Sequence, residues 1–189
     1  MITAEGLWDF IIGPEALVVL ALAALAAWPV GRRLADRAGT PRTAAVLLVL
    51  AVGVVAALTL TPNPPAPGVL ETLPAHFLTK LDDPSEVWAK LTAAPSDGEQ
   101  IANIALYVPV GLLGMLVWRS IIRGALFGAM LTLVIETCQS GIVGRAGSIT
   151  DIRNNAAGAL LGALVAAALS RTVAGNSPFR PRRPRRMNR

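Results

Sequence analysis

The stretch from Glu136 to Gly162 joins the end of one strongly apolar segment to the start of the next, and polar side chains gather in it. They include two acids, several amides and an arginine: Glu136, Gln139, Arg145, Asp151, Asn154 and Asn155. An ionisable side chain at membrane depth is costly, so it usually faces a protein interior or a water-filled cavity. We therefore take this junction as the candidate functional site.

A binding or catalytic interpretation gives these groups distinct roles. Arg145 would hold a phosphate or carboxylate, because a guanidinium bonds such an anion through two parallel hydrogen bonds. Glu136 would act as acid or base, because burial changes the pKa of a carboxyl group, and Asp151 is the third candidate catalytic residue. We expect Glu136 to pair with Arg145, since neither charge is tolerable alone in a low-dielectric site. The candidate binding residues are Asn103, Tyr107, Gln139 and Asn155.

Two other interpretations stay open at this point, and with them the question of whether the protein is an enzyme. In a structural interpretation, the polar side chains bond to one another and to helix ends, and so lock a helix bundle. In a transport interpretation, Glu136 is a proton-coupling site, although five helices without an internal repeat are few for a secondary transporter.

Metal and thiol chemistry find little support in the composition. Cys138 is the only cysteine, which excludes an intrachain disulfide and a cysteine-rich metal site. His76 is the only histidine, which excludes a zinc site with two or more histidines. A Ser-His-Asp hydrolase would depend on this one loop residue. We expect no metal and no cofactor.

The elements that position these residues are apolar helices. Hydrophobic residues make up 53% of the 189 residues and charged residues 15%, and the mean hydropathy is +0.56. Uncharged apolar runs of about 18 residues or more indicate transmembrane helices. The sequence therefore predicts an all-α integral membrane protein with a bundle of five transmembrane helices, at about residues 14–30, 44–60, 101–118, 121–140 and 151–169. Thr150 can cap the last of these helices, whose first turn contains Asp151.

The charge distribution predicts the orientation. The net charge is +5, and most basic residues flank the apolar runs or lie in the tail, which is the pattern of cytoplasmic segments. We expect no nucleic-acid partner. Residues 31–43 hold four arginines against Asp36, whereas residues 69–100 hold six acids against two lysines. The N-terminus is therefore expected outside and the C-terminus inside.

Two segments outside the five helices complete the expected domain organisation. Residues 1–175 form the transmembrane domain, and within it residues 61–100 form an outer loop. This loop is expected to carry one or two amphipathic helices on the membrane surface, with a cap at Asp83 and with Trp88 at the interface. Residues 176–189 are rich in arginine and proline, so they are expected to form a disordered basic cytoplasmic tail.

Three motifs in order resemble the VanZ-like membrane family: NIALYVPVG (103–111), IETCQ (135–139) and GRAGSITDIRNNAAGALLG (144–162). The family pattern has an N-x-x-x-F/Y-x-P-x-G helix, an E-x-x-Q helix end and an R-x-x-D-x-x-D-x-x-x-N-x-x-G-x-x-x-G segment. The matching residues are Asn103, Tyr107, Pro109, Gly111, Glu136, Gln139, Arg145, Asp151, Asn155, Gly158 and Gly162. Ser148 departs from it, because it stands where an acid is often found, so a mechanism that needs two carboxylates in this turn is not carried over.

The resemblance implies a bacterial cytoplasmic membrane protein of the cell envelope. The family's namesake is associated with resistance to teicoplanin, a glycopeptide antibiotic that bears a lipid chain. We therefore expect a polar outer-leaflet site that binds or processes a lipid-linked envelope component or a lipidated glycopeptide. The expected partners are membrane lipids, lipid-linked envelope precursors or lipoglycopeptides. The alternative is a non-catalytic membrane scaffold or accessory protein whose polar cluster is structural.

Overall fold

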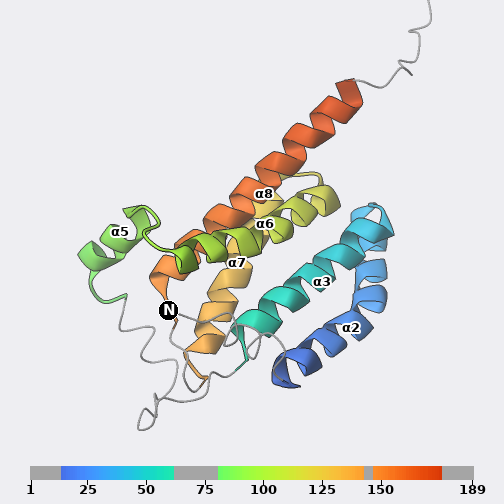
Figure 1. Cartoon of the computed structure of the whole chain (residues 1–189). Helices are drawn as coiled ribbons and strands as arrows, with labels where there is room; N and C mark the ends of the chain where they lie inside the picture. The colour runs from blue at the N-terminus through green and yellow to red at the C-terminus, as the bar shows by residue number, and fades with distance from the viewer. Residues whose placement is uncertain (1–13, 62–80, 143–146, 176–189) are drawn as a thin grey trace, which may run out of the picture.

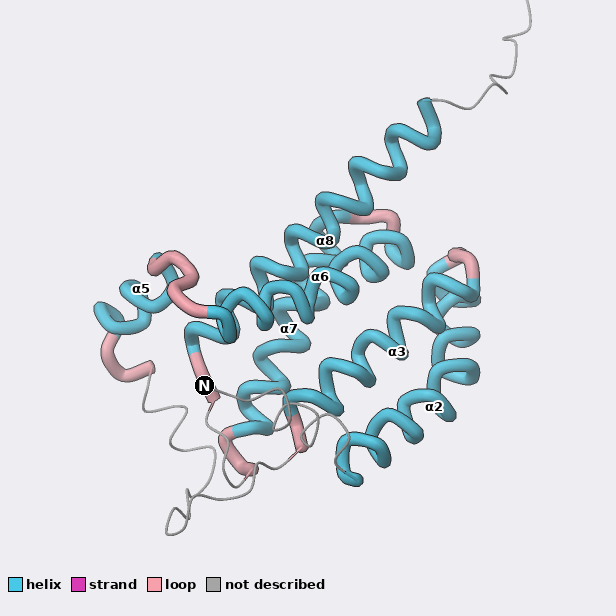
Figure 2. The backbone as a smooth tube through the Cα atoms, viewed as in Figure 1, coloured by secondary structure: helices cyan, strands magenta, loops and turns pink. Residues whose placement is uncertain are grey.

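The computed structural model describes residues 14–61, 81–142 and 147–175, and within these ranges it contains helices and no strand. Figures 1 and 2 show the helices side by side, with the short helix α5 at one edge. The helices are α2 (Pro14–Ala38), α3 (Arg42–Thr59), α5 (Pro84–Thr92), α6 (Gly98–Trp118), α7 (Ile121–Gln139) and α8 (Ile149–Gly175). The all-α architecture agrees with the prediction from the sequence.

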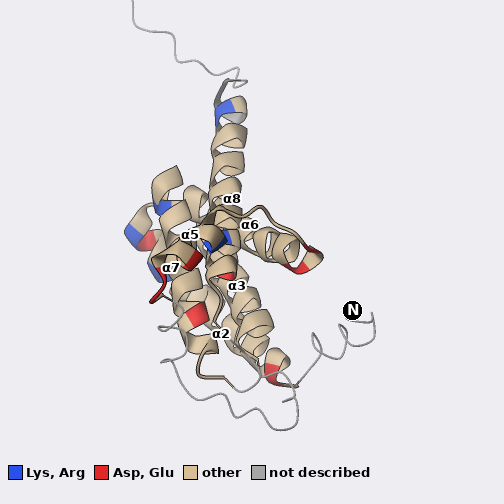
Figure 3. Cartoon of the chain, turned by 90° about the vertical axis from the view of Figure 1, so that its left-hand side faces the viewer, with Lys and Arg blue, Asp and Glu red and all other residues tan. Residues whose placement is uncertain are grey.

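Five of the described helices, all except α5, are long and apolar enough to cross a membrane. Their large apolar side chains are widely exposed, with Leu25 at 75% and Ile122 at 70% of full exposure. Such extensive apolar surface is unfavourable in water but suits contact with lipid chains. In Figure 3 the ribbon of these helices is mostly uncharged, with charged residues mainly near the helix ends. The predicted set of five membrane-crossing helices is therefore found in the structure.

The bundle has two ends of different charge. The α2–α3 turn, the α6–α7 turn and the end of α8 carry seven arginines and one acid, Asp36, and we call this the arginine end. Its arginines are Arg32, Arg33, Arg37, Arg42, Arg119, Arg123 and Arg171. A hydrogen bond of 3.2 Å from Thr40 Oγ1 to the Leu116 carbonyl joins the first two of these segments. The opposite end, which we call the acidic end, carries Glu15, Asp97, Glu99, Glu136 and Asp151.

Helix α2 continues past its expected end near residue 30 and stops at Ala38. Arginine, leucine and alanine favour helix, so the basic segment extends α2 instead of forming a loop. Gly39 then adopts a left-handed φ of 63°, and the Thr40 N–H donates to the Ala35 carbonyl at 3.2 Å. This is a Schellman ending, which satisfies carbonyls in the last turn. Helix α8 likewise runs past residue 169 to Gly175, and in Figure 1 its last turns extend beyond the other helices.

Helices α6 and α8 run parallel and approach closely because glycines line their contact. A Cβ atom placed on Gly158 would overlap the Ile104 carbonyl, and one on Gly162 would overlap the Val108 carbonyl. A Cβ atom on Gly111 would meet the backbone of Ala159 in the same way. Small residues at such spacing let helix backbones pack in a membrane. This close contact sets the register that brings the N-terminal turns of α6 and α8 together.

Helix α5 is the one short described helix, and it packs against α8. Its predicted cap is present: the Asp83 carboxylate accepts hydrogen bonds from the Ser85 and Glu86 backbone N–H groups. Bonds from the Ser85 side chain and these N–H groups hold the pKa of Asp83 below its ordinary value. Trp88 is 69% exposed, and the location of α5 at a membrane surface stays a prediction. His76 and residues 176–189 lie outside the described residues.

Candidate functional site

Polar side chains are buried where the first turns of α6 and α8 meet the last turns of α7. We call this set the polar cluster, and it consists of Asn103, Tyr107, Thr132, Glu136, Ser148, Asp151, Asn154 and Asn155. Tyr107, Thr132, Glu136, Asn154 and Asn155 are all at most 2% exposed. The cluster lies at the acidic end, and the glycine-mediated contact of α6 with α8 positions most of its members.

Glu136 holds the start of α8. Its Oε2 atom accepts a hydrogen bond of 2.7 Å from the backbone N–H of Ser148, the residue before α8. The N-terminus of a helix favours a negative charge, and a bond from an N–H group to a carboxylate is stronger than a neutral one. Because Glu136 is only 2% exposed, this interaction offsets part of the cost of burying the carboxylate. Glu136 thus has a structural role whatever else it does.

Ser148 links the two carboxyl-bearing residues of the cluster. Its N–H donates to Glu136, and its Oγ atom accepts a hydrogen bond of 3.3 Å from the Asp151 N–H. The cap of α8 is therefore Ser148, and the expectation of Thr150 was wrong, because α8 begins at Ile149. Asp151 lies in the first turn as expected. Its Oδ1 atom accepts a hydrogen bond of 2.9 Å from Asn103 Nδ2, which joins α8 to α6.

A deeper layer of the cluster contains Tyr107, Thr132 and Asn155. Asn155 Nδ2 donates to Thr132 Oγ1 at 2.9 Å, which joins α8 to α7. Three fully buried polar atoms find no hydrogen-bond partner among the described residues: Tyr107 Oη, Asn154 Nδ2 and Asn155 Oδ1. An unsatisfied buried polar group costs about 1–3 kcal/mol, so native proteins rarely keep several together without a purpose. These three atoms can therefore form hydrogen bonds with further donors or acceptors.

Gln139 is tied to another part of the bundle. Its Nε2 atom donates to the Thr59 carbonyl at 2.9 Å, so it joins the last turn of α7 to the last turn of α3. The free carbonyl groups at a helix end need such partners. The structure places Gln139 beside the cluster but uses its amide nitrogen for this connection. Arg145 lies outside the described residues, so its pairing with Glu136 stays a prediction.

Arg153 is the residue that the sequence analysis missed. Its Nη1 atom donates to the Lys90 carbonyl at 2.8 Å and to the Ala93 carbonyl, both at the end of α5. Its Nη2 atom donates to Gln100 Oε1 at 3.1 Å and to Asn154 Oδ1 at 2.8 Å. Arg153 lies just past the first turn of α8, where a cation is close to the positive end of the helix dipole, and that anomaly is the signal that could have revealed it. Arg153 connects α5 to the polar cluster.

The geometry brings together most residues that the sequence singled out, in a site built for hydrogen bonding. Asn103 and Asp151 form a partly exposed rim, and Tyr107, Glu136 and Asn155 lie beneath the surface. Among the described residues there is no group of three or more His, Cys, Asp or Glu side chains that could hold a metal. The arrangement can bind a ligand that carries hydroxyl, amide or similar groups, and it also braces three helices.

Comparison with known proteins identifies one family. The family model described as VanZ/LLP1 matches residues 45–170, which is well over half of the 189-residue chain. The match spans most of α3, all of α5, α6 and α7, and most of α8, and so contains every member of the polar cluster. No significant match was found among curated proteins or among solved structures.

Proposed function

Because this chain belongs to the VanZ/LLP1 family and has five apolar helices of a multi-pass membrane protein, we propose that its polar cluster is a ligand site in the cell envelope. The site would open to the outer leaflet of the bacterial cytoplasmic membrane. Its ligand would be the polar part of a lipid-linked envelope component or of a lipidated glycopeptide antibiotic such as teicoplanin.

One observation carries the proposal: three buried polar atoms of the polar cluster lack hydrogen-bond partners among the described residues. A cluster that served only to brace helices would be most stable with every polar group satisfied. Tyr107 Oη lies beside Thr132 but makes no contact with full hydrogen-bond geometry, and Asn155 Oδ1 is unbonded although Asn155 Nδ2 donates to Thr132 Oγ1. A ligand hydroxyl or amide could bond to both atoms, since a tyrosine hydroxyl donates or accepts and an amide oxygen accepts.

A ligand could reach these buried atoms through the partly exposed rim of the site. Asn103 and Asp151 are only partly buried, whereas Tyr107 and Asn155 are at most 2% exposed. A polar headgroup that bonds to Asp151 in place of Asn103 would open the contact between the first turns of α6 and α8. Its attached chain would stay in the lipid, beside the exposed leucines of the bundle. This geometry favours an amphiphile over a fully water-soluble ligand.

The charge difference between the two ends of the bundle supports the outer leaflet as the location of the site. Arginine-rich ends of membrane helices usually face the cytoplasm, and the arginine end lies opposite the polar cluster in the bundle. In this orientation the cluster would lie at the outer level of the membrane. Lipid-linked envelope precursors and lipoglycopeptides place their polar groups at that level, which supports this ligand class.

The competing function is a non-catalytic scaffold, and Glu136 is the observation that favours it. Its carboxylate bonds to the Ser148 N–H before α8, which is a bracing contact. In this alternative, Glu136→Gln would lower the stability of the protein and would affect function only as far as the folded protein is lost. A secondary transporter is a third possibility, which predicts proton-dependent flux in reconstituted vesicles.

Drug susceptibility tests the proposal. A deletion strain would carry empty vector, wild type or Glu136→Gln, and susceptibility to teicoplanin would be compared with susceptibility to vancomycin, which lacks the lipid chain. Thr137→Val is the matched control, because the Thr137 hydroxyl bonds within its own helix to the Leu133 carbonyl at an exposed position. Immunoblots of membranes would show that all variants reach equal levels.

We expect wild type and Thr137→Val to protect selectively against teicoplanin, and an equally abundant Glu136→Gln variant to protect less. Equal protection by all three proteins would show that Glu136 is dispensable and would favour the scaffold. Absence of selective protection by wild type would remove lipidated glycopeptides from the proposal.

A further inference from the structure

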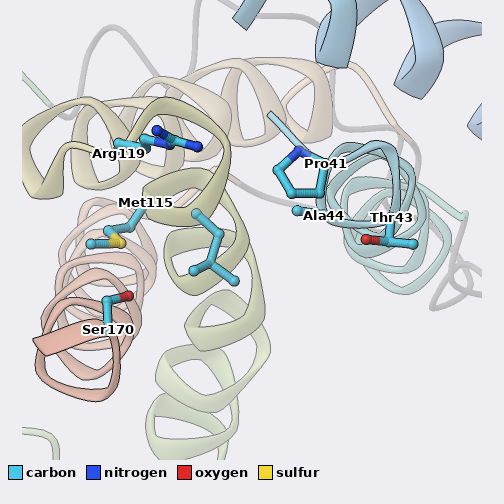
Figure 4. A pocket seen from close by; sticks show the side chains of 7 residues that line it. Pro41, Thr43, Ala44, Met115, Arg119 and Ser170 are labelled. Carbon is cyan, nitrogen blue, oxygen red and sulfur yellow. The ribbon is translucent and has the colours of Figure 1, made fainter. Parts of the chain in front are cut away.

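A second site lies at the arginine end, away from the polar cluster. It is a pocket of about 550 Å³ between the first turn of α3, the last turn of α6 and the C-terminal part of α8. This volume is within the range of small-molecule pockets. Figure 4 shows the side chains around it, which are Pro41, Thr43, Ala44, Met115, Leu116, Arg119 and Ser170.

The pocket has an apolar wall and one cation. Pro41, Ala44, Met115 and Leu116 supply most of the wall. Arg119 lies at the edge, and Figure 4 shows its side chain extending toward the α3 side of the pocket. Asp36, the only acid among the described residues of the arginine end, already lies near Arg32 and Arg42, at N–O distances of 3.9 and 3.6 Å. Arg119 has no salt bridge within the described ranges, so its charge is available to a ligand.

The backbone conformation at Arg119 is unusual for a residue with a side chain. Arg119 ends α6 with φ 51° and ψ 34°, and it is the one described non-glycine residue with a positive φ. A left-handed residue at a helix end is usually glycine, because a side chain is strained there. Retaining an arginine at such a position costs stability, and strained residues that persist point to function. The pocket is thus lined by the one described non-glycine residue with a positive φ.

We propose that this pocket binds one anionic phospholipid of the leaflet at the arginine end. The phosphate would bond to the Arg119 guanidinium, which suits phosphate oxygens in charge and geometry. Part of an acyl chain would lie against Met115 and Leu116. The N-terminus of α3 adds to the favourable potential, because its cap residue, Pro41, supplies no side-chain hydrogen bond there. This inference does not depend on the function proposed for the polar cluster.

Native mass spectrometry of the full chain in detergent tests the inference. The probes are dioleoylphosphatidylglycerol, which is anionic, and dioleoylphosphatidylcholine, which has no net charge. Arg119→Gln removes the cation, and Arg123→Gln is its matched control, because Arg123 is an exposed arginine at the same end that does not line the pocket. Ala44→Leu puts a larger side chain on the apolar wall and so fills part of the pocket. Far-UV circular dichroism would establish that each variant is folded.

We expect wild type to retain one phosphatidylglycerol in preference to phosphatidylcholine. Arg119→Gln should lower the affinity for phosphatidylglycerol about tenfold, as the loss of a charged hydrogen bond does, whereas Arg123→Gln should change it less than about twofold. Ala44→Leu should weaken the binding of both lipids. Equal losses in Arg119→Gln and Arg123→Gln would mean general surface attraction and would overturn the proposal, as would an unchanged affinity in Ala44→Leu or no lipid preference in wild type.

Two further variants keep the test decisive if a first choice does not fold. Arg119→Gly removes the cation and suits the left-handed backbone, so it should fold at least as well as wild type and still lose the lipid preference. Thr43→Leu narrows the pocket from an exposed position. An unchanged preference in folded Arg119→Gly, or an unchanged affinity for both lipids in folded Thr43→Leu, would refute the site.

Discussion

At the residue scale, the polar cluster has two kinds of members. Glu136, Ser148, Asp151 and Asn103 form a connected set of hydrogen bonds across the ends of α6, α7 and α8. Tyr107 and the two asparagines at 154 and 155 keep buried polar atoms without partners among the described residues. The first kind positions the helices, and the second kind is where a ligand would add the bonds that the protein lacks. Substitutions should separate these two roles.

The hydrogen bond between Asn103 and Asp151 should be a measurable source of stability. Asn103→Ala removes the donor and leaves a partly buried carboxyl oxygen without it, which should lower the free energy of unfolding by about 1–3 kcal/mol. Thermal unfolding in detergent would measure this loss. In a double-mutant cycle with Asp151→Ala, we expect a coupling energy of about 0.5–3 kcal/mol. Strictly additive effects would contradict the contact.

At the element scale, each helix contact has its own chemical basis. Glycines bring α6 and α8 together, a hydrogen bond from Gln139 joins α7 to α3, and Arg153 fastens α5 to α8. The first contact is packing, the second bonds an amide to a carbonyl, and the third bonds a guanidinium to carbonyls at a helix end. Each therefore predicts a different response to mutation.

Close packing of α6 on α8 should be sensitive to a single methyl group. Gly158→Ala places a Cβ atom against the Ile104 carbonyl, and relief of the overlap should cost about 1–3 kcal/mol of stability. Gly98→Ala is the control, because nothing lies within 4 Å of a Cβ atom there. Thermal unfolding in detergent should show a lower midpoint for the first variant only. Equal midpoints would argue against the packing of these helices.

Arg153 should hold α5 in place. Arg153→Met keeps much of the side-chain length but removes the donors to the Lys90 and Ala93 carbonyls, so amide hydrogen exchange in α5 should become at least about tenfold faster. Lys90→Ala is the control, since it removes only the exposed ion pair with Glu86, and such a pair contributes little to stability. Exchange in the middle of α8 should not change in either variant. Unaltered α5 exchange in Arg153→Met would contradict this role.

Sequence patterns predicted the helices better than their ends and contacts. Apolar runs identify membrane-crossing helices because lipid demands them, whereas the length of α2 depends on a glycine turn at Gly39 that composition does not reveal. The cap at Ser148 was missed because Thr150 fits the same local rule. Arg153 was missed because its partners, Lys90 and Ala93, are about 60 residues away in sequence. Long-range partners need the fold.

At the scale of the whole molecule, the two proposed sites require one orientation of the bundle in the membrane. The arginine end should face the cytoplasm and the polar cluster the outside. This arrangement puts the proposed ligand site in the outer leaflet and the phospholipid pocket in the inner leaflet. The two sites would then contact different lipids, which is a consequence of charge asymmetry along the bundle.

Single introduced cysteines would test this orientation. In a Cys138→Ala background, Ser96→Cys places a thiol at the acidic end and Thr172→Cys places one at the arginine end, both at exposed positions. A membrane-impermeant maleimide should label intact spheroplasts that carry Ser96→Cys. It should label Thr172→Cys only after lysis. The reverse pattern would invert the topology and move the polar cluster to the cytoplasmic side.

The central claim, that the polar cluster binds a ligand and does not only brace the bundle, is tested most directly by Tyr107→Phe. This change removes a buried hydroxyl that has no hydrogen-bond partner among the described residues. A purely structural cluster should tolerate it, because loss of an unsatisfied polar group is neutral or stabilising.

The measurement is teicoplanin susceptibility of the deletion strain carrying Tyr107→Phe, with membrane levels and thermal stability checked against wild type. We predict that the variant is at least as stable and abundant as wild type and yet loses most of its selective protection. Full protection by Tyr107→Phe, or a loss that only follows reduced stability, would contradict a ligand site at the polar cluster.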